Sequence, residues 1–232
     1  MAVDEALMEW SGATGGCCLR FYRWQEPTLS LGYFQVYEDR NRHAASLDCP
    51  AVRRVSGGGA ILHDVEVTYS FVVPRSHRLA QGRLALYEAV HATLVEALSQ
   101  WGVKASLCGG EDRKTTGQQP FLCFQRRAPG DVLVGRTKIA GSAQRRSAGA
   151  VLQHGSVLLA RSAAAPELEG LEEVQETSIE CDRLVHLWLE NLGERLGLAW
   201  QDERLGEPEL RRVAELMERK FGANSWTIDR GR

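Results

Sequence analysis

The chain of 232 residues lacks a long apolar run, a C-x-x-C pair and an excess of basic residues. No apolar stretch approaches the ~18 residues that suggest a transmembrane helix, and no basic segment followed by an apolar one opens the sequence, as in a secretory signal. The formal charge of -2 argues against a broad surface for nucleic acid or anionic membranes. These absences predict a cytoplasmic protein that binds neither nucleic acid nor membrane.

Cysteine is present, but in no metal-binding pattern. Six cysteines stand at positions 17, 18, 49, 108, 123 and 181, and the adjacent pair at 17 and 18 is poorly spaced for one zinc ion. A chain of this size without a secretory signal does not need disulfides. We therefore interpret the cysteines as reduced thiols and expect no metal site. Because buried cysteines usually behave as small hydrophobic residues, a catalytic role for any one of them needs further support.

The order of the expected elements favours an α+β fold. Strands are expected over residues 17–24, 28–31, 51–55, 60–63, 67–73, 131–140 and 150–160, and helices over 1–10, 38–46, 83–101, 181–196 and 208–221. Residues 67–73 alternate between apolar and polar, which is typical of a half-buried strand, and residues 108–119 are typical of a loop. We predict a mixed or antiparallel sheet with packed helices, a core over residues 1–160, and a helical segment over 161–232 packed on the same domain.

A run of glycines follows two arginines in the sequence Arg-Arg-Val-Ser-Gly-Gly-Gly-Ala at residues 53–60. Gly57, Gly58 and Gly59 allow close approach of the backbone and leave amide groups free to line a ligand. On glycine content alone, a flexible hairpin tip explains the run equally well.

Two later stretches also hold residues suited to chemistry. Lys138 lies within an apolar strand and is followed by small residues, so it could hold an acyl carbonyl or activate a thiol. The alternative is a solvated lysine at a sheet edge. In the third stretch, Gln153 and His154 enter a strand that then becomes apolar; a lone histidine is more often structural than catalytic.

In order and spacing, residues 53–60, 135–144 and 152–156 together resemble the biotin/lipoate protein ligase superfamily, with support from residues 4–7 and 28–35. The resemblance covers residues 2–159. It implies a mixed sheet with packed helices and an acyl-binding tunnel, in which the three glycines cover the acyl chain and Lys138 contacts its carbonyl. The full set of substrate-binding residues that it implies is Arg54, Ser56, Gly57, Gly58, Gly59, His63, Gly141, Ser142, Ala143, Gln153, His154 and Gly155.

Within that superfamily the chain resembles the cysteine-dependent octanoyltransferase type. The pair Cys123-Phe124 stands fifteen positions before Lys138, and residues 63–70 read His-Asp-Val-Glu-Val-Thr-Tyr-Ser. The resemblance implies that Cys123 is the nucleophile and that Lys138 activates it, because a nearby ammonium favours the thiolate. A monomer without cofactors would carry octanoyl from acyl carrier protein to a lysine of a lipoyl-domain protein, such as the glycine cleavage H protein or a dehydrogenase E2 subunit.

Three alternatives stay open: a lipoate-protein ligase that uses ATP and Mg, an amidotransferase acting between lipoyl proteins, and a non-catalytic acyl-binding module. The chain also departs from the family pattern at two places. It begins almost inside its first helix, so either the start is truncated or misassigned, or a first strand is missing. Arg126 and Arg127 stand where small or acidic residues are expected. Together with Arg145 and Arg146, these arginines would either steer acidic carrier proteins to the site or form an ordinary solvated surface.

Overall fold

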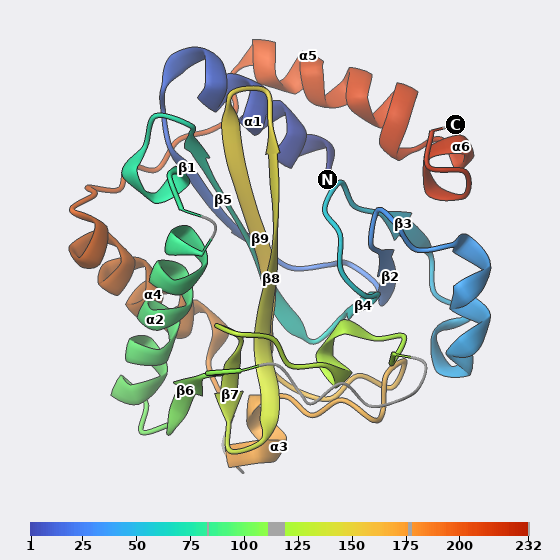
Figure 1. Ribbon diagram of the computed structural model, residues 1–232, viewed down its shortest axis with the longest axis vertical. Helices are drawn as coiled ribbons and strands as arrows, with labels where there is room; N and C mark the ends of the chain where they lie inside the picture. Colours follow the sequence, from blue (N-terminus) through green and yellow to red (C-terminus); the bar gives the residue numbers. More distant parts are fainter. Residues whose placement is uncertain (83, 111–118, 176–177, 232) are drawn as a thin grey trace.

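A six-stranded antiparallel sheet runs through the centre of the molecule (Figure 1). The computed structural model describes residues 1–82, 84–110, 119–175 and 178–231. Across the sheet the strands follow the order β1 (Cys18–Tyr22), β5 (Glu66–Pro74), β9 (Ala150–Leu158), β8 (Thr137–Ser147), β7 (Val132–Val134) and β6 (Ala105–Leu107). With helices on both faces of this sheet, the α+β prediction is confirmed.

Strand β5 is buried on both faces, so the prediction of a half-buried strand was wrong. Tyr69 and Phe71 belong to the core formed with helices α2 (Ala85–Gln100) and α4 (Cys181–Leu196). On the opposite face, Val72 packs with Leu7 and Met8 of α1 (Ala2–Thr14). Polar residues alternating along a strand usually face solvent, but here α1 packs against β5 and the indole of Trp24 donates a hydrogen bond to Thr68.

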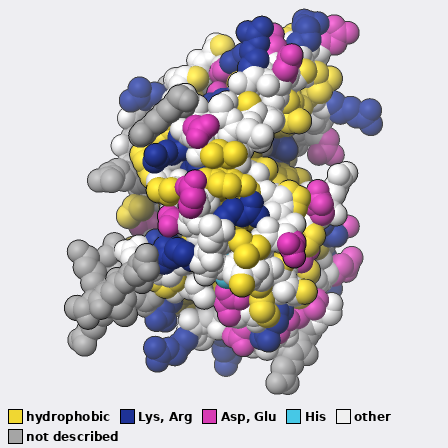
Figure 2. Space-filling view, turned by 90° about the vertical axis from the view of Figure 1, so that its right-hand side faces the viewer, with side chains coloured by type: hydrophobic (Ala, Val, Ile, Leu, Met, Phe, Trp, Pro, Cys, Tyr) yellow, Lys and Arg dark blue, Asp and Glu magenta, His cyan; other side chains and the backbone are white. Residues whose placement is uncertain are grey.

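The glycine run connects two strands of a smaller sheet, in the order β3 (Ala51–Arg53), β2 (Thr28–Leu31) and β4 (Ile61–His63). Strand β2 pairs in parallel with β3 and antiparallel with β4. Because β2 lies between β3 and β4, the run is a crossover loop and not a hairpin tip. Figure 2 shows the molecule from the side of this smaller sheet, where acidic, basic and hydrophobic side chains are interspersed.

The strand expected over residues 131–140 is in fact two strands, β7 and β8, joined by a turn at Gly135, whose φ is 59°. Because the residues on both sides of the turn are apolar, the sequence pattern indicates one continuous strand. Strand β8 also continues past Gly141 to Ser147, because Gly141 pairs with Ser156 of β9. The helix expected over 38–46 is likewise two short 3-10 helices, η1 (Tyr37–Arg42) and η2 (Ala44–Ser46).

The C-terminal helices pack on the rest of the chain: α4 lies against α2, and α5 (Glu207–Leu216) lies against α1. The remaining short elements are the 3-10 helices η3 (Arg78–Ala80) and η4 (Cys123–Gln125), the α-helices α3 (Leu171–Gln175) and α6 (Asn224–Thr227), and the short π-helix η5 (Met217–Phe221). Among the described residues, no helix has the length and apolar character needed to cross a bilayer. Most of the expected loop at 108–119 lies outside the described residues, and the division at residue 160 stays a prediction.

Candidate active site

Cys123 and Lys138 come together next to the end of the glycine loop. Lys138 is the second residue of β8, Cys123 is the first residue of η4, and Lys138 Nζ lies 3.9 Å from Cys123 Sγ. The Cys123 amide donates a hydrogen bond to the Ala60 carbonyl (2.7 Å), and the Ala60 amide donates to the Phe121 carbonyl (3.1 Å). These two bonds hold the half-buried thiol beside the residue that follows Gly59.

Lys138 is buried, so the alternative of a solvated edge lysine was wrong. Its Nζ lies 2.7 Å from Asp131 Oδ2, and the Asp131 carboxylate also accepts hydrogen bonds from Tyr87 OH (2.7 Å) and from the Ala128 amide (2.7 Å). Burial, reinforced by Asp131, raises the pKa of Tyr87 well above its usual value, so Tyr87 stays a hydrogen-bond donor. A buried ammonium needs a paired carboxylate, and this pairing sets the position of Nζ next to the thiol.

Gly141 makes room for the lysine. A Cβ at position 141 would lie 2.5 Å from Lys138 Cε and 2.8 Å from Nζ. Gly155 has a similar steric role on β9, because its Cβ would lie 2.2 Å from Ser142 Oγ. Both glycines were predicted to border the substrate, and the structure shows that each permits close packing of polar groups.

The guanidinium of Arg54 holds the glycine loop in shape. It donates hydrogen bonds to the carbonyls of Ser30 (2.9 Å), Gly57 (2.8 Å) and Gly59 (2.6 Å). Burial lowers the pKa of Arg54 to about 10, so the group stays charged at neutral pH. Gly58 has a φ of 97°, a conformation that favours glycine. Arg54 therefore supports the loop through its carbonyls and leaves the loop amides available.

A buried chain of polar groups links the loop to α1. Ser56 Oγ lies 2.5 Å from His154 Nε2, and His154 Nδ1 lies 3.8 Å from Asp4 Oδ2. Burial lowers the pKa of His154, although Asp4 opposes the effect, so the imidazole is neutral at neutral pH. Arg20 in turn contacts the other oxygen of Asp4 at 2.7 Å. Ser56 and His154 are thus brought together as predicted from the resemblance, while Asp4 was not expected.

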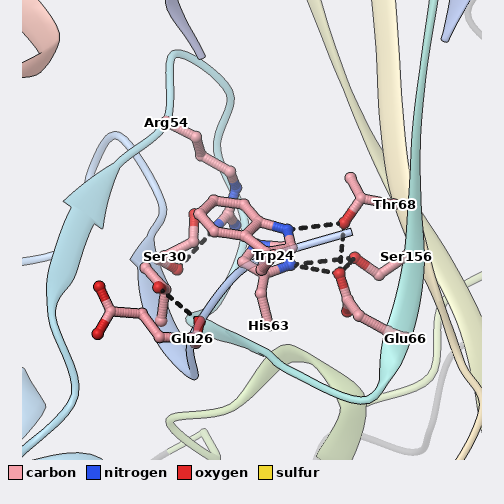
Figure 3. A network of polar contacts seen from close by, with 9 residues as sticks. Trp24, Glu26, Ser30, Arg54, His63, Glu66, Thr68 and Ser156 are labelled. Carbon is pink, nitrogen blue, oxygen red and sulfur yellow. Dashed lines mark hydrogen bonds and ion pairs between the residues drawn. The ribbon is translucent and has the colours of Figure 1, made fainter. Parts of the chain in front are cut away.

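A second network surrounds His63 (Figure 3). His63 Nδ1 lies 2.6 Å from Glu66 Oε1, which also accepts hydrogen bonds from the Thr68 hydroxyl and from Ser156 Oγ (3.0 Å). The indole of Trp24 stacks on the His63 ring with a centroid distance of 4.3 Å. His63 Nε2 is buried and has no hydrogen-bond partner among the described residues.

A narrow pocket connects the two networks. It is lined by five of the predicted residues, Arg54, His63, Ala143, His154 and Gly155, together with Met1, Tyr22, Ile61, Thr68 and Ser156. Its volume is about 20 Å³, enough for about one water molecule.

Ser142 and Gln153, which were also predicted to bind substrate, direct their side chains away from this pocket. Both side chains hydrogen-bond to Tyr69 OH, on the face of the sheet that α2 covers. Ser142 Oγ is also 2.6 Å from His91 Nε2, and burial lowers the pKa of His91 to about 4. These residues stabilise the interior behind the site. The described residues contain no group of three or more His, Cys, Asp or Glu able to hold a metal ion.

Residues 1–179 match the lipoyl protein ligase A/B catalytic domain family. The chain belongs to this family. It is 40% identical over 167 residues to octanoyltransferase LipM of Moorella thermoacetica, covering 68% of this chain and 60% of that protein. It is 32% identical to octanoyltransferase LipM of Symbiobacterium thermophilum, covering 98% and 93% of the two chains. Protein Ta0514 of T. acidophilum has the same fold, with a TM-score of 0.79 at 22% identity over 98% of this chain and 92% of that one.

Membership of the lipoyl protein ligase A/B family confirms the predicted superfamily and fold. The chain spans less than two thirds of the length of the Moorella relative. Sequence reasoning missed Asp131, Tyr87 and Asp4, which hold Lys138 and His154. For Asp131 a signal was available, since an acidic residue at the start of an apolar strand needs a buried partner.

Proposed function

We propose that this chain is a cytoplasmic octanoyltransferase that moves octanoyl from acyl carrier protein to a lysine of a lipoyl-domain protein. The observation that carries the proposal is the pairing of Cys123 Sγ with the buried Lys138 Nζ at 3.9 Å, directly beside the glycine loop. The names of the relatives, octanoyltransferase LipM, agree with this activity.

In the first step, the Cys123 thiolate attacks the thioester carbonyl of the donor. The bond between carbonyl carbon and donor sulfur breaks, the donor leaves as a thiol that has taken up one proton, and octanoyl stays on Cys123 as a new thioester. The Lys138 ammonium stabilises the thiolate before attack, because a neighbouring cation favours the charged sulfur. Asp131 keeps that ammonium in place.

In the second step, the amine of the acceptor lysine attacks the Cys123 thioester. The amide bond forms as the bond between the carbonyl carbon and the Cys123 sulfur breaks. The sulfur leaves as a thiolate, and it takes up the proton that the attacking nitrogen loses. A thioester is already an activated acyl group, so neither step needs ATP or a metal ion. Amides of the glycine loop, which Arg54 leaves available, are suited to stabilise the carbonyl oxygen as negative charge develops.

The acyl chain would occupy the narrow pocket between the His63 and His154 networks. At about 20 Å³ the pocket is too small for an octanoyl chain, so side chains at its rim must move when the chain enters. The lining includes apolar surface from Met1, Tyr22 and Ile61, which favours a hydrocarbon.

A transfer assay distinguishes this proposal from the alternatives. The purified chain is mixed with a lipoyl domain and one of three donors: octanoyl-acyl carrier protein without ATP, octanoic acid with ATP and Mg, or an octanoylated lipoyl protein of different mass without ATP. The mass of the lipoyl domain is followed, and binding of octanoate to the chain is measured separately. The proposal predicts a mass gain with the carrier alone and its loss in Cys123→Ala. A gain that appears only with octanoic acid and ATP would indicate a ligase, and a gain only from an octanoylated lipoyl protein would indicate an amidotransferase. Binding of octanoate without any transfer would indicate an acyl-binding module.

A further inference from the structure

A groove of about 260 Å³ opens beside Lys138, separate from the narrow pocket. Its lining shares no residue with the lining of that pocket. The β7–β8 turn contributes Arg136 and Thr137, the chain next to Cys123 contributes Phe124, Gln125 and Arg127, and residues 167–169 form the opposite wall. Since Lys138 lines the groove and reaches Cys123 Sγ, a molecule lying in it would have one end at the thiol.

The charges in this groove favour an anion at its outer end. Two carboxylates line it, but Glu167 is held by His43 (2.7 Å), and Glu169 by Thr137 (3.2 Å) and Arg161 (3.5 Å). Arg136 is exposed and makes no hydrogen bond or ion pair with another described residue. Its guanidinium is therefore available to bind an anion from solution.

The arginines at the other end of β8 do not share this position. Arg145 is seven residues beyond Lys138, about 23 Å along the strand, and Arg146 donates hydrogen bonds to the carbonyls of Ala80 and Gly82 (both 2.6 Å). Arg126 donates to the Pro120 carbonyl (2.9 Å). Of the arginines considered for steering, only Arg127 lines the groove, and Arg136 was not among them.

We propose that this groove binds the phosphopantetheine arm of the acyl donor, with Arg136 contacting the phosphodiester. The inference rests on the proposed transferase function. The arm carries a thioester at one end, two amides and a dimethyl-substituted carbon in the middle, and a phosphodiester at the other end. Lys138 and Cys123 stand at the thioester end, Gln125 and Leu168 offer polar and apolar contacts to the middle, and Arg136 meets the phosphodiester.

The test compares donors that differ only in the phosphate. Rates of Cys123 acylation are measured with octanoyl-pantetheine and octanoyl-phosphopantetheine for the wild type, Arg136→Gln and Arg136→Lys. Arg145→Gln is the matched control, an exposed arginine on β8 that lies far from the groove. We expect the wild type to prefer the phosphorylated donor, and Arg136→Gln to lose about fivefold to tenfold of this preference, as expected for one charge-assisted hydrogen bond near solvent. Arg136→Lys should retain part of the preference, and Arg145→Gln all of it.

Octanoyl-acyl carrier protein and octanoyl-coenzyme A then identify the source of the arm. A rate loss in Arg136→Gln with both donors supports recognition of phosphopantetheine from either source, and a loss with the carrier protein alone supports the protein-borne arm. Equal wild-type rates with and without the phosphate, or an unchanged preference in Arg136→Gln, would overturn the proposal while leaving Cys123 acylation intact. If no donor acylates Cys123 in the wild type, the transferase function and this inference both fail.

Discussion

Replacing Gly141 with alanine tests how closely the position of Lys138 controls the reaction. The new Cβ would lie 2.5 Å from Lys138 Cε, whereas ordinary contacts begin at 3.4 Å. The end of the lysine must therefore retreat on the order of 1 Å, which separates Nζ from Asp131, from Cys123 or from both. Because a shift of about 1 Å can cost roughly 100-fold in rate, we expect acylation of Cys123 to slow by that factor.

The assay is the single-turnover rate of Cys123 acylation, followed by intact-protein mass spectrometry, with urea unfolding measured in parallel. Overpacking should lower the free energy of unfolding of Gly141→Ala by about 1–3 kcal/mol, which leaves the protein folded. Gly109→Ala is the control, since a Cβ at position 109 meets nothing within 4 Å. A wild-type rate in Gly141→Ala would refute the role assigned to the lysine.

Asp131→Asn keeps the size of the side chain but leaves the Lys138 ammonium buried without its counter-charge, and we expect urea titration to show a loss of about 3 kcal/mol in unfolding free energy; an unchanged midpoint would count against the ion pair. Gly32→Ala would place a Cβ 2.1 Å from the Gly58 carbonyl oxygen, so the glycine loop must shift, and the acylation rate should fall; a wild-type rate would show that the loop shape is not needed. Burial lowers the folded-state pKa of His91 to about 4, below its unfolded value near 6.5, so the unfolded chain binds more protons between these values. Stability should therefore be full above pH 6.5, fall by up to about 3 kcal/mol towards pH 4, and fall less steeply in His91→Gln; equal slopes would contradict this assignment.

The sequence pattern correctly predicted helices and strands whose ends are marked by proline or glycine. Strand β2 at residues 28–31 and helix α4 at residues 181–196 have the expected bounds, because Pro27 and Gly197 mark their ends and the apolar spacing within α4 is regular. The turn at Gly135 was not predicted, since the residues on both sides of it are apolar.

The sequence predicted part of the site, and the residues that it did not predict reach the site through tertiary contacts. The resemblance brought Cys123 and Lys138 together, but Asp131, just before β7, pairs with the lysine, and Tyr87 of α2 donates a hydrogen bond to Asp131. No periodic pattern reports which buried carboxylate will meet which buried ammonium. The burial of Thr68 on β5 escaped for a related reason: the side chains that cover it, including Trp24, come from distant segments.

Peptide mapping of the acylated protein shows which residue carries the octanoyl group. The chain is incubated with octanoyl-acyl carrier protein in the absence of ATP and of any acceptor, digested, and analysed by mass spectrometry before and after hydroxylamine. Acylation through a Cys123 thioester predicts one octanoyl group on the peptide that contains Cys123, removed by hydroxylamine and absent in Cys123→Ala. An octanoyl group on another residue, or no stable adduct while transfer to a lipoyl domain proceeds in Cys123→Ala, would contradict it.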